Sequence, residues 1–302
     1  MAGRGLAHQD CYVVVRGLRH HYVDYGGAGE VIIALPGLVQ TARAFDSVAP
    51  LLVPHVRLIA LDFRGRGETE WGPPERYRFD QYLKDVREFI NLLGFDKVGF
   101  IGTSLGGFVA RMFATAYPAR VTRLILNDCA IGGNVAGMLR VGARPATAPE
   151  EFASLREAVE WFHATRPGMD RMDAETQKEY VSHYLKATPN GGLCFNCDPA
   201  VVRMAEALVR QLLGFQRTDL ESKVAWEQAS RLTMPLLMIR GALSDVIAPA
   251  TVARMQQVLP HAQSVEIPGV SHSPTLYEPE AQAAIRDFFG IPTPELAAEA
   301  AV

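Results

Sequence analysis

A chain of 302 residues is long enough for one large α/β domain, or for one domain that carries a sizeable insertion. Its 30 lysines and arginines against 33 acidic residues give a formal charge of −3, which excludes the basic surface that attracts nucleic acids or anionic membranes. No apolar run approaches the roughly 18–20 residues of a membrane helix, and MAGRGLAHQD lacks the apolar core of a secretory signal, so we expect a cytoplasmic protein.

Short β-branched runs alternate with helical patterns in the first part of the chain, which is typical of a mostly parallel sheet. The expected strands are Cys11–Arg16, His20–Asp24, Val31–Leu35, Val56–Asp62, Lys97–Thr103 and Val121–Asn127. The helices expected between them are Thr41–Leu52, Phe79–Leu93 and Leu105–Tyr117.

From residue 132 to 232 the pattern predicts helices alone, at Glu150–His163, Glu175–Lys186 and Ala200–Leu213. The alternation then resumes with the strands Pro235–Arg240 and Ser264–Ile267 and the helices Ala250–Leu259 and Pro279–Phe289. We interpret this as a core domain in two parts, 1–131 and 233–302, with a helical cap at 132–232. The tail after Gly290 is expected to be a frayed surface segment.

Four cysteines are too few and too scattered for a disulfide framework in a chain of this length. Cys194 and Cys197 form a CxxC pair, but no second pair of ligands follows at a spacing that suits zinc. We therefore expect ordinary reduced thiols and no metal site.

Ser104 lies in the stretch GFIGTSLGGFVA, between Gly102 and Gly106 and with Gly107 close behind. It follows a strand pattern and opens a helical one. A nucleophile at such a sharp turn needs small neighbours, and the amides at the start of the helix stabilise negative charge beside it. The alternative is a tight loop with a helix-capping serine. A phosphate-binding loop fits poorly, because the lysine of that motif is absent.

A serine hydroxyl becomes a good nucleophile when a base removes its proton, and a third group must orient that base. His272 lies in a loop, GVSHSPTLYEP, between the last strand and the last helix. Asp245 follows the strand PLLMIR at the carboxyl edge of the sheet, where such sites assemble. Asp128, directly after Val121–Asn127, is the alternative acid; we favour Asp245 because it gives the chain order Ser, Asp, His.

An oxyanion hole needs two amide donors aimed at the developing charge. The amide of Leu105, directly after the serine, is one candidate. The turn LPGL after Val31–Leu35 offers the amide of Leu38 as the second.

The chain resembles the α/β-hydrolase superfamily, in particular compact bacterial hydrolases with a helical cap after the sixth strand. The stretches that carry this resemblance are LPGL, LDFRGRGET, GTSLGG, LILND, RGALSD and GVSHSPTL. The resemblance runs from Cys11 to Phe289 and implies a mostly parallel eight-stranded sheet. It also implies that Ser104 is the nucleophile and His272 the general base. Asp245 would be its partner, and Leu38 and Leu105 would supply the oxyanion amides.

The expected reaction is the hydrolysis of a small, mainly apolar ester or lactone through an acyl-enzyme, which needs no metal or organic cofactor. Relatives that cut C–C bonds usually carry asparagine before the nucleophile and methionine after it, where this chain has Thr103 and Leu105. C–C cleavage on the same residues stays an alternative, and so does a ligand receptor without turnover. Trp161 and Phe162 are candidates for the substrate pocket, although core positions of the cap explain them as well. The sequence leaves a homodimer open.

Overall fold

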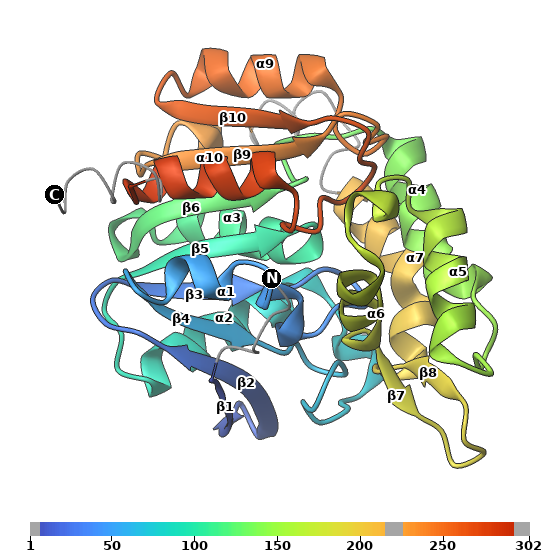
Figure 1. Cartoon of the computed structure of the whole chain (residues 1–302). Helices are drawn as coiled ribbons and strands as arrows, with labels where there is room; N and C mark the ends of the chain where they lie inside the picture. The colour runs from blue at the N-terminus through green and yellow to red at the C-terminus, as the bar shows by residue number, and fades with distance from the viewer. Residues whose placement is uncertain (1–6, 215–225, 293–302) are drawn as a thin grey trace, which may run out of the picture.

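The computed structural model describes residues 7–214 and 226–292. An eight-stranded sheet with the order β1-β2-β4-β3-β5-β6-β9-β10 forms its centre (Figure 1). β1 pairs antiparallel with β2, and β2 with β4, whereas all other neighbouring pairs are parallel. The mostly parallel sheet expected from the sequence is therefore confirmed. The strands are β1 (Gln9–Val15), β2 (Leu18–Gly26), β3 (Val31–Leu35), β4 (Arg57–Leu61), β5 (Val98–Thr103), β6 (Val121–Asn127), β9 (Leu236–Gly241) and β10 (Ala262–Ile267).

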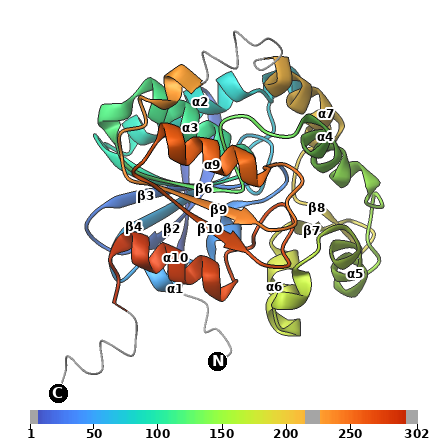
Figure 2. The same cartoon turned by 90° about the horizontal axis from the view of Figure 1, so that it is seen from above.

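Helices cover both faces of the sheet, as Figure 2 shows from above. On one face lie α1 (Ala49–Leu52) and α10 (Pro279–Phe289), and on the other α2 (Phe79–Leu92), α3 (Leu105–Ala116) and α9 (Pro249–Val258). Successive side chains of a strand point to opposite faces, so Ile32 of β3 packs in the core under α1 and α10 while Ile33 packs in the core under α2 and α3. This double cover explains why strands such as β5 are apolar along their whole length.

The chain between β6 and β9 forms a layer beside the carboxyl ends of the parallel strands (Figure 1). Its helices are α4 (Val135–Ala143), α5 (Leu155–Thr165), α6 (Ala174–Ser182) and α7 (Pro199–Gly214). It also contains an antiparallel hairpin of β7 (Leu185–Ala187) and β8 (Leu193–Phe195), so the expectation of helices alone is wrong there. The Pro-Asn-Gly-Gly run between these strands favours the turn that pairs them, and the helix expected to reach Lys186 ends at Ser182.

Short 3₁₀ turns complete the described structure. The helix expected over Thr41–Leu52 is in fact a 3₁₀ turn followed by the four-residue α1. The cap boundaries at 132–232 stay a prediction, and most of the tail after Gly290 lies outside the described residues. No described helix is both long and apolar enough to cross a membrane. The 3₁₀ turns are η1 (Ala42–Phe45), η2 (Pro74–Arg76), η3 (Pro118–Arg120), η4 (Arg144–Thr147) and η5 (Met169–Arg171).

Candidate active site

Ser104 lies at the sharp turn between β5 and α3. Its backbone has φ 50° and ψ −111°, a conformation that a residue with a side chain rarely adopts. The Ser104 amide donates to the Asn127 carbonyl at 2.9 Å, and the Phe108 amide donates to the Ser104 carbonyl at 3.0 Å. These bonds fix the turn to β6 on one side and to α3 on the other, so the strained conformation is held from both sides.

The glycines around Ser104 permit close backbone contacts. A Cβ atom on Gly102 would lie 2.6 Å from the backbone of Gly107, and one on Gly106 would lie 2.0 Å from the carbonyl oxygen of Leu35. A Cβ atom on Gly107 would lie 2.7 Å from Cβ of Cys129. The three glycines therefore let α3 start directly against β3 and β6, which places Ser104 at the carboxyl edge of the sheet.

A hydrogen-bonded chain links Ser104 to a histidine and an aspartate. His272 Nε2 lies 2.8 Å from Ser104 Oγ, and His272 Nδ1 lies 2.6 Å from Asp128 Oδ2. Asp128 is fully buried and His272 is 5% exposed. A carboxylate on Nδ1 keeps the proton on that nitrogen and leaves Nε2 free to accept the serine proton, which is the arrangement of a base that activates a nucleophile.

Two further donors hold the Asp128 carboxylate. Ser244 Oγ donates to Oδ2 at 2.7 Å and the Gly241 amide donates to Oδ1 at 3.3 Å. The Asp128 backbone has φ 50°, a left-handed conformation that is uncommon for a residue with a side chain. These bonds fix the direction of the Asp128 carboxylate toward His272.

The expectation that Asp245 partners His272 is wrong. The Asp245 carboxylate is 39% exposed and forms an ion pair with Arg140 of α4, with Oδ2 2.9 Å from Nη2. α4 packs so closely on this loop that a Cβ atom on Gly137 would lie 1.8 Å from the Asp245 carbonyl oxygen. The loop therefore presents Asp245 to α4, while its neighbour Ser244 contacts the buried carboxylate of Asp128.

The loop that carries His272 is tied to the rest of the molecule through its backbone. Asn127 Nδ2 donates to the Pro274 carbonyl at 2.9 Å and to Thr103 Oγ1 at 3.1 Å. Arg144 Nη1 donates to the His272 carbonyl at 3.1 Å. The sequence analysis did not single out Asn127 or Arg144, and only the position of Asn127 at the end of a predicted strand pointed to this edge.

Leu38 and Leu105, the two residues expected to supply the oxyanion amides, both lie at the cavity that contains Ser104 and His272. Within the described residues, neither of their amide nitrogens donates a hydrogen bond. An amide without an internal acceptor, in a turn such as that of Leu38 or at a helix start such as that of Leu105, is available to negative charge on a bound molecule.

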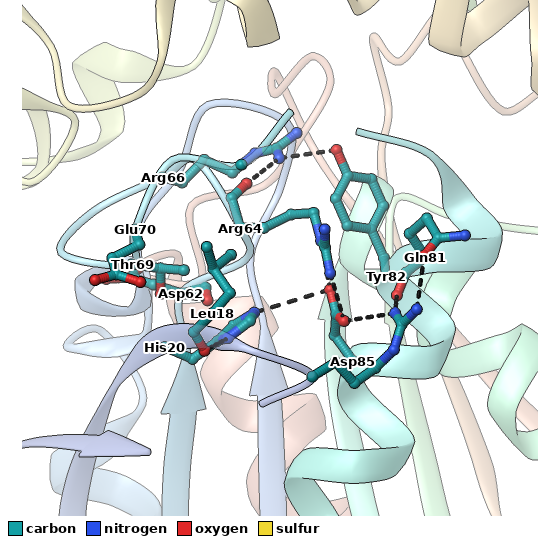
Figure 3. Close-up of polar contacts among 12 residues, drawn as sticks. Leu18, His20, Asp62, Arg64, Arg66, Thr69, Glu70, Gln81, Tyr82 and Asp85 are labelled. Atoms are coloured by element: carbon teal, nitrogen blue, oxygen red, sulfur yellow. Dashed lines mark hydrogen bonds and ion pairs between the residues drawn. The ribbon is translucent and has the colours of Figure 1, made fainter. Parts of the chain in front are cut away.

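Arg66 lies in the stretch LDFRGRGET, for which the sequence suggested no role, and it supports the Leu38 turn. The side chain is fully buried and its Nε donates to the Leu38 carbonyl at 2.7 Å. Its Nη1 donates to the Arg64 carbonyl and to the Tyr82 hydroxyl, both at 2.9 Å. Figure 3 shows this arginine beside Tyr82, with Arg64 pointing toward Asp85 of α2. α2 and the loop after β4 thus hold the turn that carries the Leu38 amide.

Two small cavities meet at Ser104 and His272, with volumes of about 50 and 40 Å³. The first is apolar, and the second has polar and aromatic walls that include Trp161. Phe162 is fully buried and lines neither cavity; its ring packs on Tyr184, with centroids 4.9 Å apart. Of the two predicted pocket residues, the structure therefore brings only Trp161 to the site. The apolar lining of the first cavity comprises Leu38, Phe79, Leu105, Phe108, Met138, Val141, Ala205 and Val246.

Among the described residues, one group has possible metal-ligand atoms close together. It consists of Asp46, Glu179 and His183. Asp46 already forms an ion pair with Arg43, with Oδ2 2.6 Å from Nη2. The four cysteines are free, and burial raises the pKa of the Cys129 thiol to about 12 and of the Cys197 thiol to about 11. Thiols with such pKa values are poor metal ligands and poor nucleophiles at neutral pH.

Comparison with known proteins gives the class to which this fold and site belong. The family model described as alpha/beta hydrolase fold matches residues 30–279, and the chain belongs to this family. Among solved structures, an alpha/beta hydrolase from Novosphingobium aromaticivorans superimposes with a TM-score of 0.83 at 28% identity, covering 96% of this chain and 100% of that one.

Two relatives are enzymes with named activities. A 3-hydroxybutyrate-oligomer hydrolase of Cupriavidus necator is 30% identical over 284 residues, covering 90% of this chain and 92% of that protein. An N-formylmaleamate deformylase of Pseudomonas putida is 27% identical over 263 residues, covering 86% of this chain and 88% of that protein. Together with the family match, these relatives identify the chain as a hydrolase.

Proposed function

We propose that the protein is a serine hydrolase that cleaves a carboxylic ester or lactone of a small molecule through an acyl-enzyme. The observation that carries the proposal is the continuous chain of hydrogen bonds from Ser104 Oγ through His272 to the buried carboxylate of Asp128, at 2.8 and 2.6 Å. Two free amides beside the serine complement it. The name of the Cupriavidus relative, a hydrolase of 3-hydroxybutyrate oligomers, supports an ester as the scissile bond.

In the proposed mechanism, Ser104 Oγ attacks the ester carbonyl carbon while His272 Nε2 takes the hydroxyl proton. The carbonyl oxygen gains negative charge and is stabilised by the amides of Leu38 and Leu105. Asp128 stays ionised and stabilises the imidazolium. The carbon–oxygen bond to the alcohol then breaks, and His272 returns the proton to the leaving alkoxide.

Water completes the proposed cycle. His272 takes a proton from a water molecule, which attacks the acyl carbon of the Ser104 ester. The tetrahedral intermediate collapses to the free acid, and the proton on Nε2 returns to Ser104 Oγ. Every step uses side chains and amides of the chain itself.

Turnover of 4-nitrophenyl esters of several acyl lengths tests the proposal, combined with a small organophosphonate that labels activated serines. We expect release of nitrophenolate, and mass spectrometry should find the phosphonate on Ser104 alone. Ser104→Ala should abolish both, because only a base-activated serine attacks phosphorus quickly. A stable protein that binds these esters without hydrolysing them would favour a receptor and contradict the proposal.

A further inference from the structure

The second cavity at Ser104 and His272 has two arginines in its wall. Arg144 belongs to η4 and Arg166 follows α5, and both lie beside Gln40 and Ser273. The aromatic side chains of Trp161 and Phe195 also line this cavity. Two positive charges thus lie in one cavity with the proposed nucleophile and base.

Arg166 is held in place without a negatively charged partner. Its Nη1 donates to the hydroxyls of Tyr180 at 3.1 Å and Tyr184 at 3.0 Å. The Tyr180 hydroxyl is buried and its pKa is raised well above its ordinary value, mainly by burial, so it is neutral. The Nε atom of Arg166 is buried and has no hydrogen-bond partner. A guanidinium has five N–H donors, so part of its capacity is unused.

Arg144, like Arg166, forms no ion pair within the described residues. The one hydrogen bond that its guanidinium forms within the described residues goes to the His272 carbonyl. Burial, and next the charge of Arg166, lower the pKa of Arg144 to about 10. Across residues 7–214 and 226–292, neither arginine lies within ion-pair distance of a carboxylate. The charge of Asp245 opposes these two effects on Arg144, but its carboxylate forms an ion pair with Arg140, four residues earlier.

The charge of Arg166 acts against that of Arg144, and an anion between the two guanidinium groups would relieve this repulsion. Arginine is suited to a carboxylate, because its parallel N–H groups match the two oxygens. Trp161 and Phe195 offer apolar surface for the carbon chain that carries the carboxylate.

We propose that this cavity binds a free carboxylate of the substrate, so that the enzyme prefers esters that carry a carboxylate away from the scissile bond. Arg144 and Arg166 hold the carboxylate while the ester carbonyl lies at Ser104. The inference rests on the proposed function and names its substrate class as anionic esters.

Paired substrates test it directly. In the first pair, mono-4-nitrophenyl glutarate carries a carboxylate on its acyl side that 4-nitrophenyl pentanoate lacks. In the second pair, 3-acetoxybutanoate carries a free carboxylate on its alcohol side, which is blocked in its methyl ester. In at least one pair we expect the anionic ester to have the higher kcat/KM. Arg144→Gln and Arg166→Gln should each lower kcat/KM for that anionic ester about 10–100-fold, because a hydrogen bond to a charged group is lost. In Arg166→Gln the neutral ester should change by less than about threefold. Arg144→Gln also removes the hydrogen bond to the His272 carbonyl, so for this variant we expect the loss on the anionic ester to exceed the loss on the neutral ester.

Arg140→Gln is the matched control, because Arg140 lies four residues before Arg144, does not line the cavity and pairs with Asp245. It should leave both substrates unchanged. Equal losses on the anionic and the neutral ester would mean that the arginines only support the fold or the His272 loop, and would overturn the inference. Arg166→Lys, which keeps the charge, should recover part of the preference if Arg166→Gln folds poorly.

The melting temperature measured with glutarate tests the anion site independently of the proposed function. Glutarate should raise the melting temperature of the wild type but not of Arg144→Gln, and dimethyl glutarate should have no effect. If no ester were cleaved but glutarate stabilised the protein through Arg144, the proposed function would fail and the anion site would stand. If neutral and anionic esters were cleaved alike and glutarate had no effect, the anion site would be rejected and the proposed function would stand.

Discussion

Gly106 lies on the first turn of α3, where a missing side chain decides how closely the helix approaches β3. In an ordinary helix, alanine in place of glycine stabilises by about 1 kcal/mol. Here the added Cβ atom would lie 2.0 Å from the Leu35 carbonyl oxygen, so the backbone before the Leu38 turn must move. We expect Gly106→Ala to lower kcat by about 100-fold or more, since displacements near 1 Å in the site cost that much. Gly72→Ala is the control, because its nearest contact would be an ordinary 3.7 Å; equal activity of the two variants would contradict this reading.

The thiols give a second prediction at the residue scale. Cys129 and Cys197 are buried with pKa values raised by burial to about 12 and about 11, whereas Cys11 and Cys194 are partly exposed. Iodoacetamide at pH 8 should alkylate Cys11 and Cys194 in the folded protein and leave the other two unmodified, because the thiolate is the reactive form. Peptide mass mapping measures this. Alkylation of Cys197 as fast as Cys194 would show that the CxxC pair is more open than described.

At the scale of elements, Asp85 of α2 joins the helix to the loop after β4. Its carboxylate lies 2.6 Å from both Nε and Nη2 of the buried Arg64 (Figure 3). It also lies 2.8 Å from Nη1 of Arg16. Asp85→Asn leaves Arg64 buried without its anion and should lower the free energy of unfolding by about 3–5 kcal/mol. Urea unfolding measures the change. Asp80→Asn on the same helix removes an exposed carboxylate and should cost less than about 1 kcal/mol, so similar losses in the two variants would contradict the argument.

The elements also explain which parts of the site the sequence could predict. Ser104, Leu38 and His272 follow from local patterns, since each lies in a turn or loop that follows a predicted strand and has a recognisable Gly-containing motif. The acid did not follow, because Asp128 and Asp245 both lie between Ser104 and His272 in the chain and give the same order. Only the direction of each loop separates them, and α4, which the sequence analysis did not predict, faces Asp245. Asp128 was nonetheless the aspartate directly after a strand, whereas Ala242, Leu243 and Ser244 separate Asp245 from β9.

At the scale of the whole molecule, the layer between β6 and β9 forms part of the cavity walls, and there the sequence was least informative. Arg144 and Arg166 gave no recognisable motif. Trp161 and Phe162 are adjacent in α5 but differ in role, since helical neighbours point in different directions: Trp161 lines the second cavity and Phe162 is buried between helices. Such a distinction depends on how α5 is rotated against the sheet domain, which no short pattern encodes.

Trp161→Ala should therefore change substrate preference, and Phe162→Ala should change stability. For Trp161→Ala we expect the ratio of kcat/KM between long and short neutral esters to shift by about 10–200-fold, while a small phosphonate still labels Ser104 at nearly the wild-type rate. For Phe162→Ala we expect a loss of about 3–5 kcal/mol of stability from the cavity it leaves. A general loss of phosphonate reactivity in folded Trp161→Ala would mean that this layer contributes to the chemistry.

The acid of the proposed triad is the point on which the account can be tested most directly. Asp128→Asn and Asp245→Asn should be compared by kcat on a 4-nitrophenyl ester, with circular dichroism to show that both fold. Loss of the carboxylate on His272 Nδ1 should lower kcat by roughly 10²–10⁴-fold in Asp128→Asn. Asp245→Asn removes only a half-exposed ion pair with Arg140 and should stay within about threefold of the wild type. A large loss in Asp245→Asn with an active Asp128→Asn would contradict the account.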